Sequence, residues 1–251
     1  MLIPVLSALD PGEFFTFPPT DVSSRWFREF LANRSWRSST LLTFSIAIMT
    51  AAVSSVVGGL AGIAFARVHS RMRPIFYPLL VGPLIVPVII LAVSFYGVAL
   101  EYGLVGNLFA FVVANALLSA PLVALLVSGV ALRMDSRIEL ASLSCGAGRL
   151  RTLAFVTVPM VAPSALAGGA LAFLLVLDEV QMSIFLVAPD RTPLAVKMFL
   201  AAFQGTTPIV TAASSFLLVS AVVIIGVVTL VRNRLAARGT TMAVPGLEEQ
   251  G

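Results

Sequence analysis

Reactive side chains are scarce in this sequence. Its 251 residues include one cysteine (Cys145), one histidine (His69) and one lysine (Lys197). A single cysteine excludes an internal disulfide, and the lack of a Cys/His cluster argues against a metal site. No glycine-rich phosphate loop precedes Lys197, so we expect no ATP-binding P-loop. No nucleophile–base or paired-carboxylate arrangement indicates an enzyme, and we therefore expect no catalytic residue, no cofactor and no metal.

Charged residues are also few, at 11%, whereas hydrophobic residues make up 59%. A soluble surface needs roughly a quarter charged residues, so the composition predicts a membrane protein. Several apolar runs reach the ~20 residues that a helix needs to cross a bilayer. In lipid, backbone polar groups must form their hydrogen bonds within the protein, so these runs are expected to be helices. Proline at positions 83, 87 and 121 is expected to kink these helices. The sequence predicts an all-α polytopic bundle with five spans: 40–66, 75–100, 107–132, 160–185 and 208–231.

Arginine placement predicts the orientation of these spans. The net charge of +4 would suggest nucleic acid in a soluble protein, but 10 of the 16 basic residues lie in three short segments beside apolar runs. Those segments are alternate connections, so the positive-inside rule places all three in the cytoplasm and gives no reason for a nucleic-acid partner. We therefore expect an extracytoplasmic segment 1–39, a transmembrane domain 40–232 with a cytoplasmic loop 133–159, and a cytoplasmic tail 233–251.

The extracytoplasmic segment contains an amphipathic stretch, residues 22–36. Its apolar side chains Trp26, Phe27, Phe30 and Leu31 recur at helical spacing among arginines. This pattern fits a helix that lies at the membrane interface, and equally a helix packed on the domain.

The loop 133–159 is more organised than a simple connection requires. Residues 136–145 and 149–158 are compatible with two short helices, and the intervening Gly146-Ala147-Gly148 breaks them apart. We expect a helix–turn–helix on the inner membrane surface that can dock into another protein.

This loop resembles the E-A-A-x-x-x-G signature of binding-protein-dependent ABC importer permeases. The matching residues are Ala141, Gly146, Ala147, Pro159 and Pro163. The glutamate of the signature falls on Leu140 and its second alanine on Ser142, while Glu139 is one position earlier. Adjacent helical positions point about 100° apart, so Glu139 is not an automatic substitute. Residues 18–36, 177–180 and 192–199 are similar to segments of spermidine/putrescine permeases, and the likeness extends over residues 10–235.

The resemblance implies a type I ABC importer permease fold and a set of partners. These are separate ABC ATPase subunits, a second similar permease, an external solute-binding protein and the bilayer of the bacterial inner (plasma) membrane. Such permeases have six spans, and residues 1–9 read as the outer end of a missing first one, through a misplaced start or a real loss. The implied ATPase-coupling residues are Glu139, Leu140, Ala141, Gly146, Ala147 and Pro159.

The implied translocation pathway would be lined by polar groups within spans, and a carboxylate in a membrane needs a partner or a water-filled cavity. One hypothesis is that Asp178 or Glu179 helps to pass a cationic, polyamine-like solute; the other is that both make structural contacts at the outer end of their span. Gln181 and Asn115 are further pathway candidates, although such residues more often bond one helix to another.

Two other classes of function fit the sequence less well. A stand-alone secondary transporter or channel would show inverted repeats and charges near the bilayer centre, and neither is evident. A membrane scaffold gives no reason for the organised loop. Polyamine permeases also resemble permeases for other small cations, amino-acid derivatives and opines, whose selectivity depends largely on the binding protein.

Overall fold

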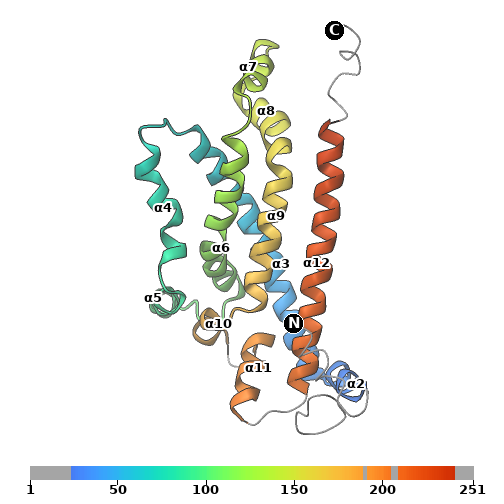
Figure 1. The fold of residues 1–251 in the computed structure, drawn as a ribbon. Helices are drawn as coiled ribbons and strands as arrows, with labels where there is room; N and C mark the ends of the chain where they lie inside the picture. The colour runs from blue at the N-terminus through green and yellow to red at the C-terminus, as the bar shows by residue number, and fades with distance from the viewer. Residues whose placement is uncertain (1–23, 189–190, 205–208, 241–251) are drawn as a thin grey trace.

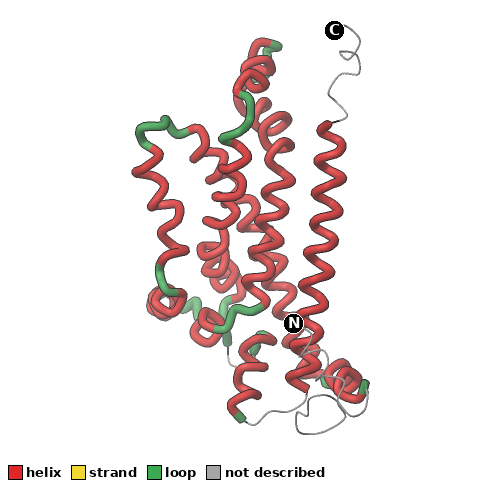
Figure 2. The backbone as a smooth tube through the Cα atoms, viewed as in Figure 1, coloured by secondary structure: helices red, strands yellow, loops and turns green. Residues whose placement is uncertain are grey.

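The computed structural model describes residues 24–188, 191–204 and 209–240, and within these ranges the chain is helices and connecting loops (Figure 2). Residues 1–9, which the sequence suggested to be part of a missing span, and the end of the tail, 241–251, lie outside the described residues. Four helical segments are long and apolar enough to cross a membrane, or five if a sharply bent pair forms one span. The prediction of an all-α membrane bundle is therefore confirmed.

The centre of the bundle is formed by three long helices: α3 (Arg34–Arg67), α6 (Leu108–Ala131) and α9 (Val158–Leu177). Glycine lets α3 and α6 approach closely, as small residues do at membrane helix interfaces. A Cβ atom added at Gly58 would lie 2.4 Å from the carbonyl oxygen of Ala120. Asparagine side chains cap the starts of both helices: Asn33 Oδ1 accepts from Ser35 N at 2.9 Å, and Asn107 Oδ1 accepts from Phe109 N at 2.9 Å.

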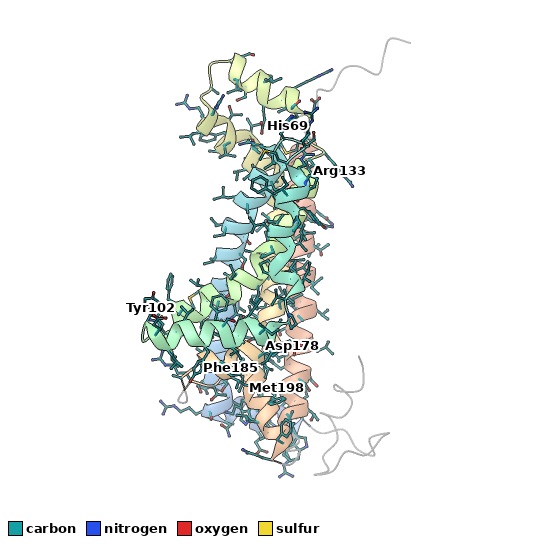
Figure 3. All side chains as sticks on the ribbon, turned by 90° about the vertical axis from the view of Figure 1, so that its left-hand side faces the viewer. His69, Tyr102, Arg133, Asp178, Phe185 and Met198 are labelled. Atoms are coloured by element: carbon teal, nitrogen blue, oxygen red, sulfur yellow. The ribbon has the colours of Figure 1, made fainter. Side chains whose placement is uncertain are left out.

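The expected span 75–100 is not one helix. It is divided into α4 (Arg73–Ile85) and α5 (Val88–Glu101), which are bent by 89°. The residue before a proline avoids the helical region, and Val86, before Pro87, is extended with ψ 131°. A kink was predicted at Pro87, but the result is a break, and α5 runs across the long axis of the bundle (Figure 3).

The fourth expected span, 160–185, also has different limits. Its helix begins at Arg149, as α8 (Arg149–Thr152), continues through a π-helical segment η1 (Leu153–Thr157) into α9, and ends at Leu177. The second half of the expected helix–turn–helix is thus the start of the span. The π-helical turn lies directly before Pro159, which has no N–H to bond the carbonyl of Phe155. After a break at 178–180, a separate helix α10 (Gln181–Leu186) follows.

The outer helices complete the arrangement (Figure 1). The helix α2 (Arg25–Ala32) packs on α12 (Ile209–Thr240) through Phe30, which is 1% exposed and whose ring centroid lies 5.6 Å from that of Phe216. The short helix α11 (Leu194–Phe203) packs beside α3, where Leu194 N donates to Thr43 Oγ1 at 2.8 Å. The sequence left open whether α2 lies at the membrane interface or on the domain, and these contacts fit the second arrangement.

The two ends of the bundle differ in their number of arginines. His69 and Arg133 lie at one end, and Tyr102 and Phe185 at the other (Figure 3). The first end, which we call the arginine-rich end, carries the connections 67–74 and 133–148, and a helix α7 (Ser136–Ser144) projects beyond it (Figure 1). The opposite end carries α2, α5, α10 and α11.

Candidate functional site

The first candidate site is α7 and the turn that follows it. Asp135 starts the helix, since its Oδ1 accepts from Arg137 N at 2.9 Å. Gly146 ends it with φ +85°, a left-handed conformation that glycine adopts without strain. The backbone N–H groups of Gly146 and Ala147 donate to the carbonyls of Leu143 and Ser142, at 3.0 and 3.2 Å, which is the Schellman pattern of a helix C-terminus. The turn at Gly146 is therefore built into the backbone.

The two faces of α7 are chemically different. Glu139 points toward the bundle, where its Oε1 accepts from Thr157 Oγ1 at 2.6 Å and pairs with Arg67 at 2.9 Å. Ser142, one turn further on, has its Oγ 3.1 Å from Thr152 Oγ1. The other face is open, and Leu140 is 59% exposed there.

Several large apolar side chains are exposed at this end, among exposed arginines and serines. Apolar side chains seldom form an exposed group on a protruding segment unless something covers them. The exposed large apolar residues of α7 and α8 are Ile138, Leu140, Leu143 and Leu150, the last at 82%.

The six predicted coupling residues thus divide by position. Leu140, Ala141 and Gly146 are exposed on α7 and its turn, and Ala147 is half-buried. Glu139 is held between α7 and two spans by its bonds to Arg67 and Thr157. Pro159 lies away from α7, in the continuous helix 149–177.

The second candidate site is a cavity of about 830 Å³ bounded by α4, α5, α6, α9, α10 and α11. All four predicted pathway residues line it: Asn115, Asp178, Glu179 and Gln181. Ser119 is the fifth polar residue of the lining, and the rest is apolar. Among the described residues that line the cavity there is no arginine, lysine or histidine, so its formal charge is negative.

The two carboxylates of this cavity have different roles in the structure. Glu179 is folded back onto the first turn of α10: its Oε1 accepts from Met182 N at 2.7 Å and its Oε2 from Ser183 N at 3.0 Å. These bonds satisfy amide groups that a helix start leaves without partners. Asp178 is exposed, and within the described part of the chain no hydrogen bond or ion pair engages its carboxylate. Both carboxylates follow the last residue of α9, so the helix of the expected span 160–185 ends before them.

The polar candidates on α6 are largely committed to the helices. The side-chain amide of Asn115 donates to Phe111 O at 3.0 Å, and the residue is 2% exposed. Ser119 Oγ lies 2.7 Å from Ser54 Oγ of α3. Such hydrogen bonds within and between helices are the alternative to substrate contact that the sequence left open.

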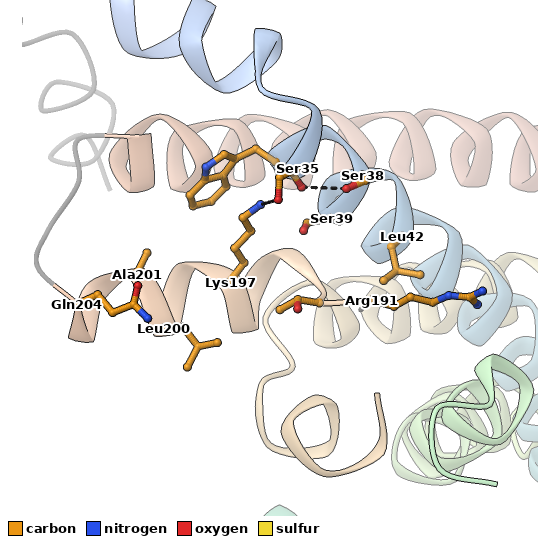
Figure 4. A pocket seen from close by; sticks show the side chains of 11 residues that line it. Ser35, Ser38, Ser39, Leu42, Arg191, Lys197, Leu200, Ala201 and Gln204 are labelled. Atoms are coloured by element: carbon orange, nitrogen blue, oxygen red, sulfur yellow. Dashed lines mark hydrogen bonds between the residues drawn. The ribbon is translucent and has the colours of Figure 1, made fainter. Parts of the chain in front are cut away.

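A further cavity, of about 570 Å³, lies between α3 and α11 at the opposite end from α7 (Figure 4). Its lining is basic, with Arg191 and Lys197. The Lys197 amino group donates to Ser35 Oγ at 2.5 Å and lies 4.7 Å from the centre of the Trp36 ring. Partial burial lowers the pKa of Lys197. Sequence reasoning did not select this lysine as a site residue, although its being the single lysine was a usable signal.

Solved structures with the same architecture are membrane subunits of ABC importers. A chain of a bacterial ABC transporter that imports the acidic polysaccharide alginate superposes with a TM-score of 0.69 at 17% identity, covering 91% of this chain and 88% of that one. A chain of the MetNI methionine ABC transporter superposes with a TM-score of 0.64 at 16% identity, covering 86% and 99%. The fold is that of an ABC importer permease.

By sequence, the chain is similar to polyamine permeases. The putrescine transport system permease protein PotI of Escherichia coli K12 is 28% identical over 212 residues, covering 81% of this chain and 75% of the relative. The spermidine/putrescine permease protein PotC of the same strain is 24% identical over 224 residues, covering 89% and 83%. No protein-family model matches the chain. These relatives confirm the resemblance first indicated by the loop at 139–163, and the chain is a multi-pass membrane protein similar to polyamine ABC permeases.

Proposed function

We propose that this chain is the membrane-spanning permease subunit of an ATP-driven importer in the bacterial inner (plasma) membrane. The observation that carries the proposal is the exposed apolar face of α7, held out by the turn at Gly146, in a chain similar to PotI over 81% of its length. Leu140, Leu143 and Leu150 offer an apolar surface to a groove on a separate ATPase subunit. The arginine-rich end would then face the cytoplasm, as the positive-inside rule requires.

The same proposal includes the other parts of an importer. A second, similar permease would close the cavity of α4, α5, α6, α9 and α10, and a solute-binding protein would deliver solute to the opposite end. One relative of known structure is an alginate transporter in complex with a periplasmic protein that holds an alginate pentasaccharide. An alginate transporter with the same fold is involved in the import of an acidic polysaccharide, so the fold alone does not select the charge of the solute.

The chemistry of the cavity supports a small cationic solute of the polyamine kind. Two carboxylates and no basic residue line it within the described chain. A negative potential in an apolar surround attracts cations and repels anions, and the low dielectric strengthens both effects. Asp178 is the group best placed to contact the solute, because Glu179 is already bonded to the start of α10. Apolar lining residues such as Leu118 and Leu174 suit the methylene chain of a polyamine.

ATP-dependent uptake of putrescine tests this function. The complex of this chain with its ATPase, partner permease and binding protein would be reconstituted into liposomes, and labelled putrescine inside the vesicles would be measured. We expect uptake with ATP and none with a non-hydrolysable analogue. Uptake by the chain alone, driven by an ion gradient without the ATPase, would instead identify a stand-alone secondary transporter.

A further inference from the structure

The contacts of Glu139 point to a role that differs from docking. Its carboxylate, 31% exposed, accepts a hydrogen bond from Thr157 Oγ1 at 2.6 Å and one from Arg67 Nη2 at 2.9 Å. Arg67 Nη2 also lies 3.3 Å from Thr157 Oγ1, which closes a triangle of three side chains. The three residues come from the end of α3, from α7 and from the π-helical segment that follows α8 in the next span.

The electrostatic state of this cluster agrees with its geometry. The hydrogen bond from Thr157, assisted by the guanidinium of Arg67, lowers the pKa of the Glu139 carboxyl, although partial burial opposes the shift. The carboxylate is therefore charged at neutral pH. Thr157 is 2% exposed, so its hydroxyl cannot exchange this acceptor for bulk water.

The position of the cluster gives it mechanical importance. A cavity of about 200 Å³ lies behind α7, bordered by Arg67, Arg73, Asp135 and Glu139, so α7 stands away from the ends of α3 and α6 rather than packing on them. Thr157 ends a π-helical turn, and such turns occur often at functional sites because their hydrogen-bond pattern can shift. A force on α7 therefore reaches α3 through the Glu139 carboxylate, which also joins α7 to the π-helical turn. The contact between Ser142 and Thr152 is a second link to the start of that span.

We propose that Glu139 is a positioning residue that fixes α7 to the ends of α3 and the fourth span, so that a displacement of α7 moves both spans together. The inference rests on the proposed function, in which the ATPase supplies that displacement. It assigns the ATPase contact to the exposed apolar face around Leu140 and removes Glu139 from that contact.

The single cysteine offers a direct test in the full-length chain without its partners. Cys145 is exposed at the end of α7, so a nitroxide attached to it reports the mobility of that helix by electron paramagnetic resonance. We expect Glu139→Gln to increase the mobility of the label, and the exchanged pair Arg67→Glu with Glu139→Arg to restore it. The matched control is Asp135→Asn, which removes the same charge on the same segment but keeps a capping oxygen. An unchanged spectrum in Glu139→Gln would overturn the proposal.

A second measurement separates positioning from docking. In the reconstituted complex we expect Glu139→Gln to keep its ATPase subunits and to hydrolyse ATP, while the putrescine imported per ATP falls by about tenfold. Glutamine keeps an acceptor oxygen but removes the charge that strengthens the bonds from Thr157 and Arg67. Parallel loss of the ATPase and of hydrolysis would show instead that Glu139 contacts the ATPase. If the wild-type complex imports no putrescine at all, the proposed function fails, and the mobility of the Cys145 label still decides whether Glu139 holds α7.

Discussion

Two pairs of neighbouring residues, Glu139–Leu140 on α7 and Asp178–Glu179 after α9, were selected by the sequence, and the structure divides both pairs in the same way. In each, a glutamate is bonded within the protein: Glu139 to Arg67 and Thr157, and Glu179 to the backbone of Met182 and Ser183. The neighbouring residue of each pair is exposed. Leu140 lies on the open face of α7, and Asp178 lines the large cavity. The comparison teaches that the glutamate of each pair holds the local structure together, and that its neighbour is the exposed residue, for which we propose contact with the partner or the solute.

The largest effect is expected from Leu140→Asp, which places a charge on the exposed face of α7. In the complex this charge would be buried in the ATPase groove without a partner, and the contact of an apolar side chain would be lost. We expect the affinity for the ATPase to fall by about 100-fold or more, measured by titrating the ATPase onto the chain in nanodiscs. Arg137→Gln, an equal change of charge on exposed α7, is the control. Similar losses in both variants would show that charge alone matters there.

A smaller effect is expected at the other pair, from Asp178→Asn. Removing the exposed carboxylate weakens the attraction of the cavity for a cation, so putrescine uptake should fall by about tenfold, with the thermal stability of the chain unchanged. Glu179→Ala should act mainly on stability: it leaves two amides of α10 without their acceptor and lowers the free energy of unfolding by about 1–2 kcal/mol. Uptake assays and thermal unfolding in detergent measure both. Equal uptake by wild type and Asp178→Asn would remove Asp178 from the pathway.

The smallest effect should come from the turn after α7. Gly146 has φ +85° and a Cβ there would meet no atom within 4 Å, so Gly146→Ala adds backbone strain without a clash. A non-glycine residue in this region costs about 1–2 kcal/mol, and the affinity for the ATPase should fall by about five- to tenfold. Gly148 has φ −69° and equal space around it, so Gly148→Ala is the matched control and should have no effect. A deficit of the same size in the control would mean that bulk, and not conformation, is the cause.

The sequence predicted those helix limits that depend on the length of an apolar run and on a capping residue. The third expected span, 107–132, is observed as α6 (Leu108–Ala131), because Asn107 provides a recognisable cap and the run is uninterrupted. The break at 178–180 was missed, because neither glycine nor proline marks it. What shortens that span is a tertiary arrangement in which Glu179 turns back to start α10. Sequence patterns carry no signal for such a contact.

For the candidate sites, the sequence identified the residues but not the directions of their side chains. Periodicity cannot show which of two adjacent side chains points inward, because this depends on what lies beside the helix. Glu139 turns toward Arg67 and Thr157, which are 72 and 18 residues away in the chain. The four pathway residues were selected as polar groups within apolar runs. The structure brings them to one cavity from α6, from the break at 178–180 and from the first residue of α10.

The central claim is that an ATPase drives transport through the exposed face of α7. Its most direct test is putrescine uptake by liposomes that contain the complete complex, compared between wild type and Leu140→Asp at saturating ATP. We predict ATP-dependent uptake in the wild type and its loss in Leu140→Asp together with the loss of bound ATPase. Full ATP-driven uptake by Leu140→Asp with the ATPase still attached would contradict the claim.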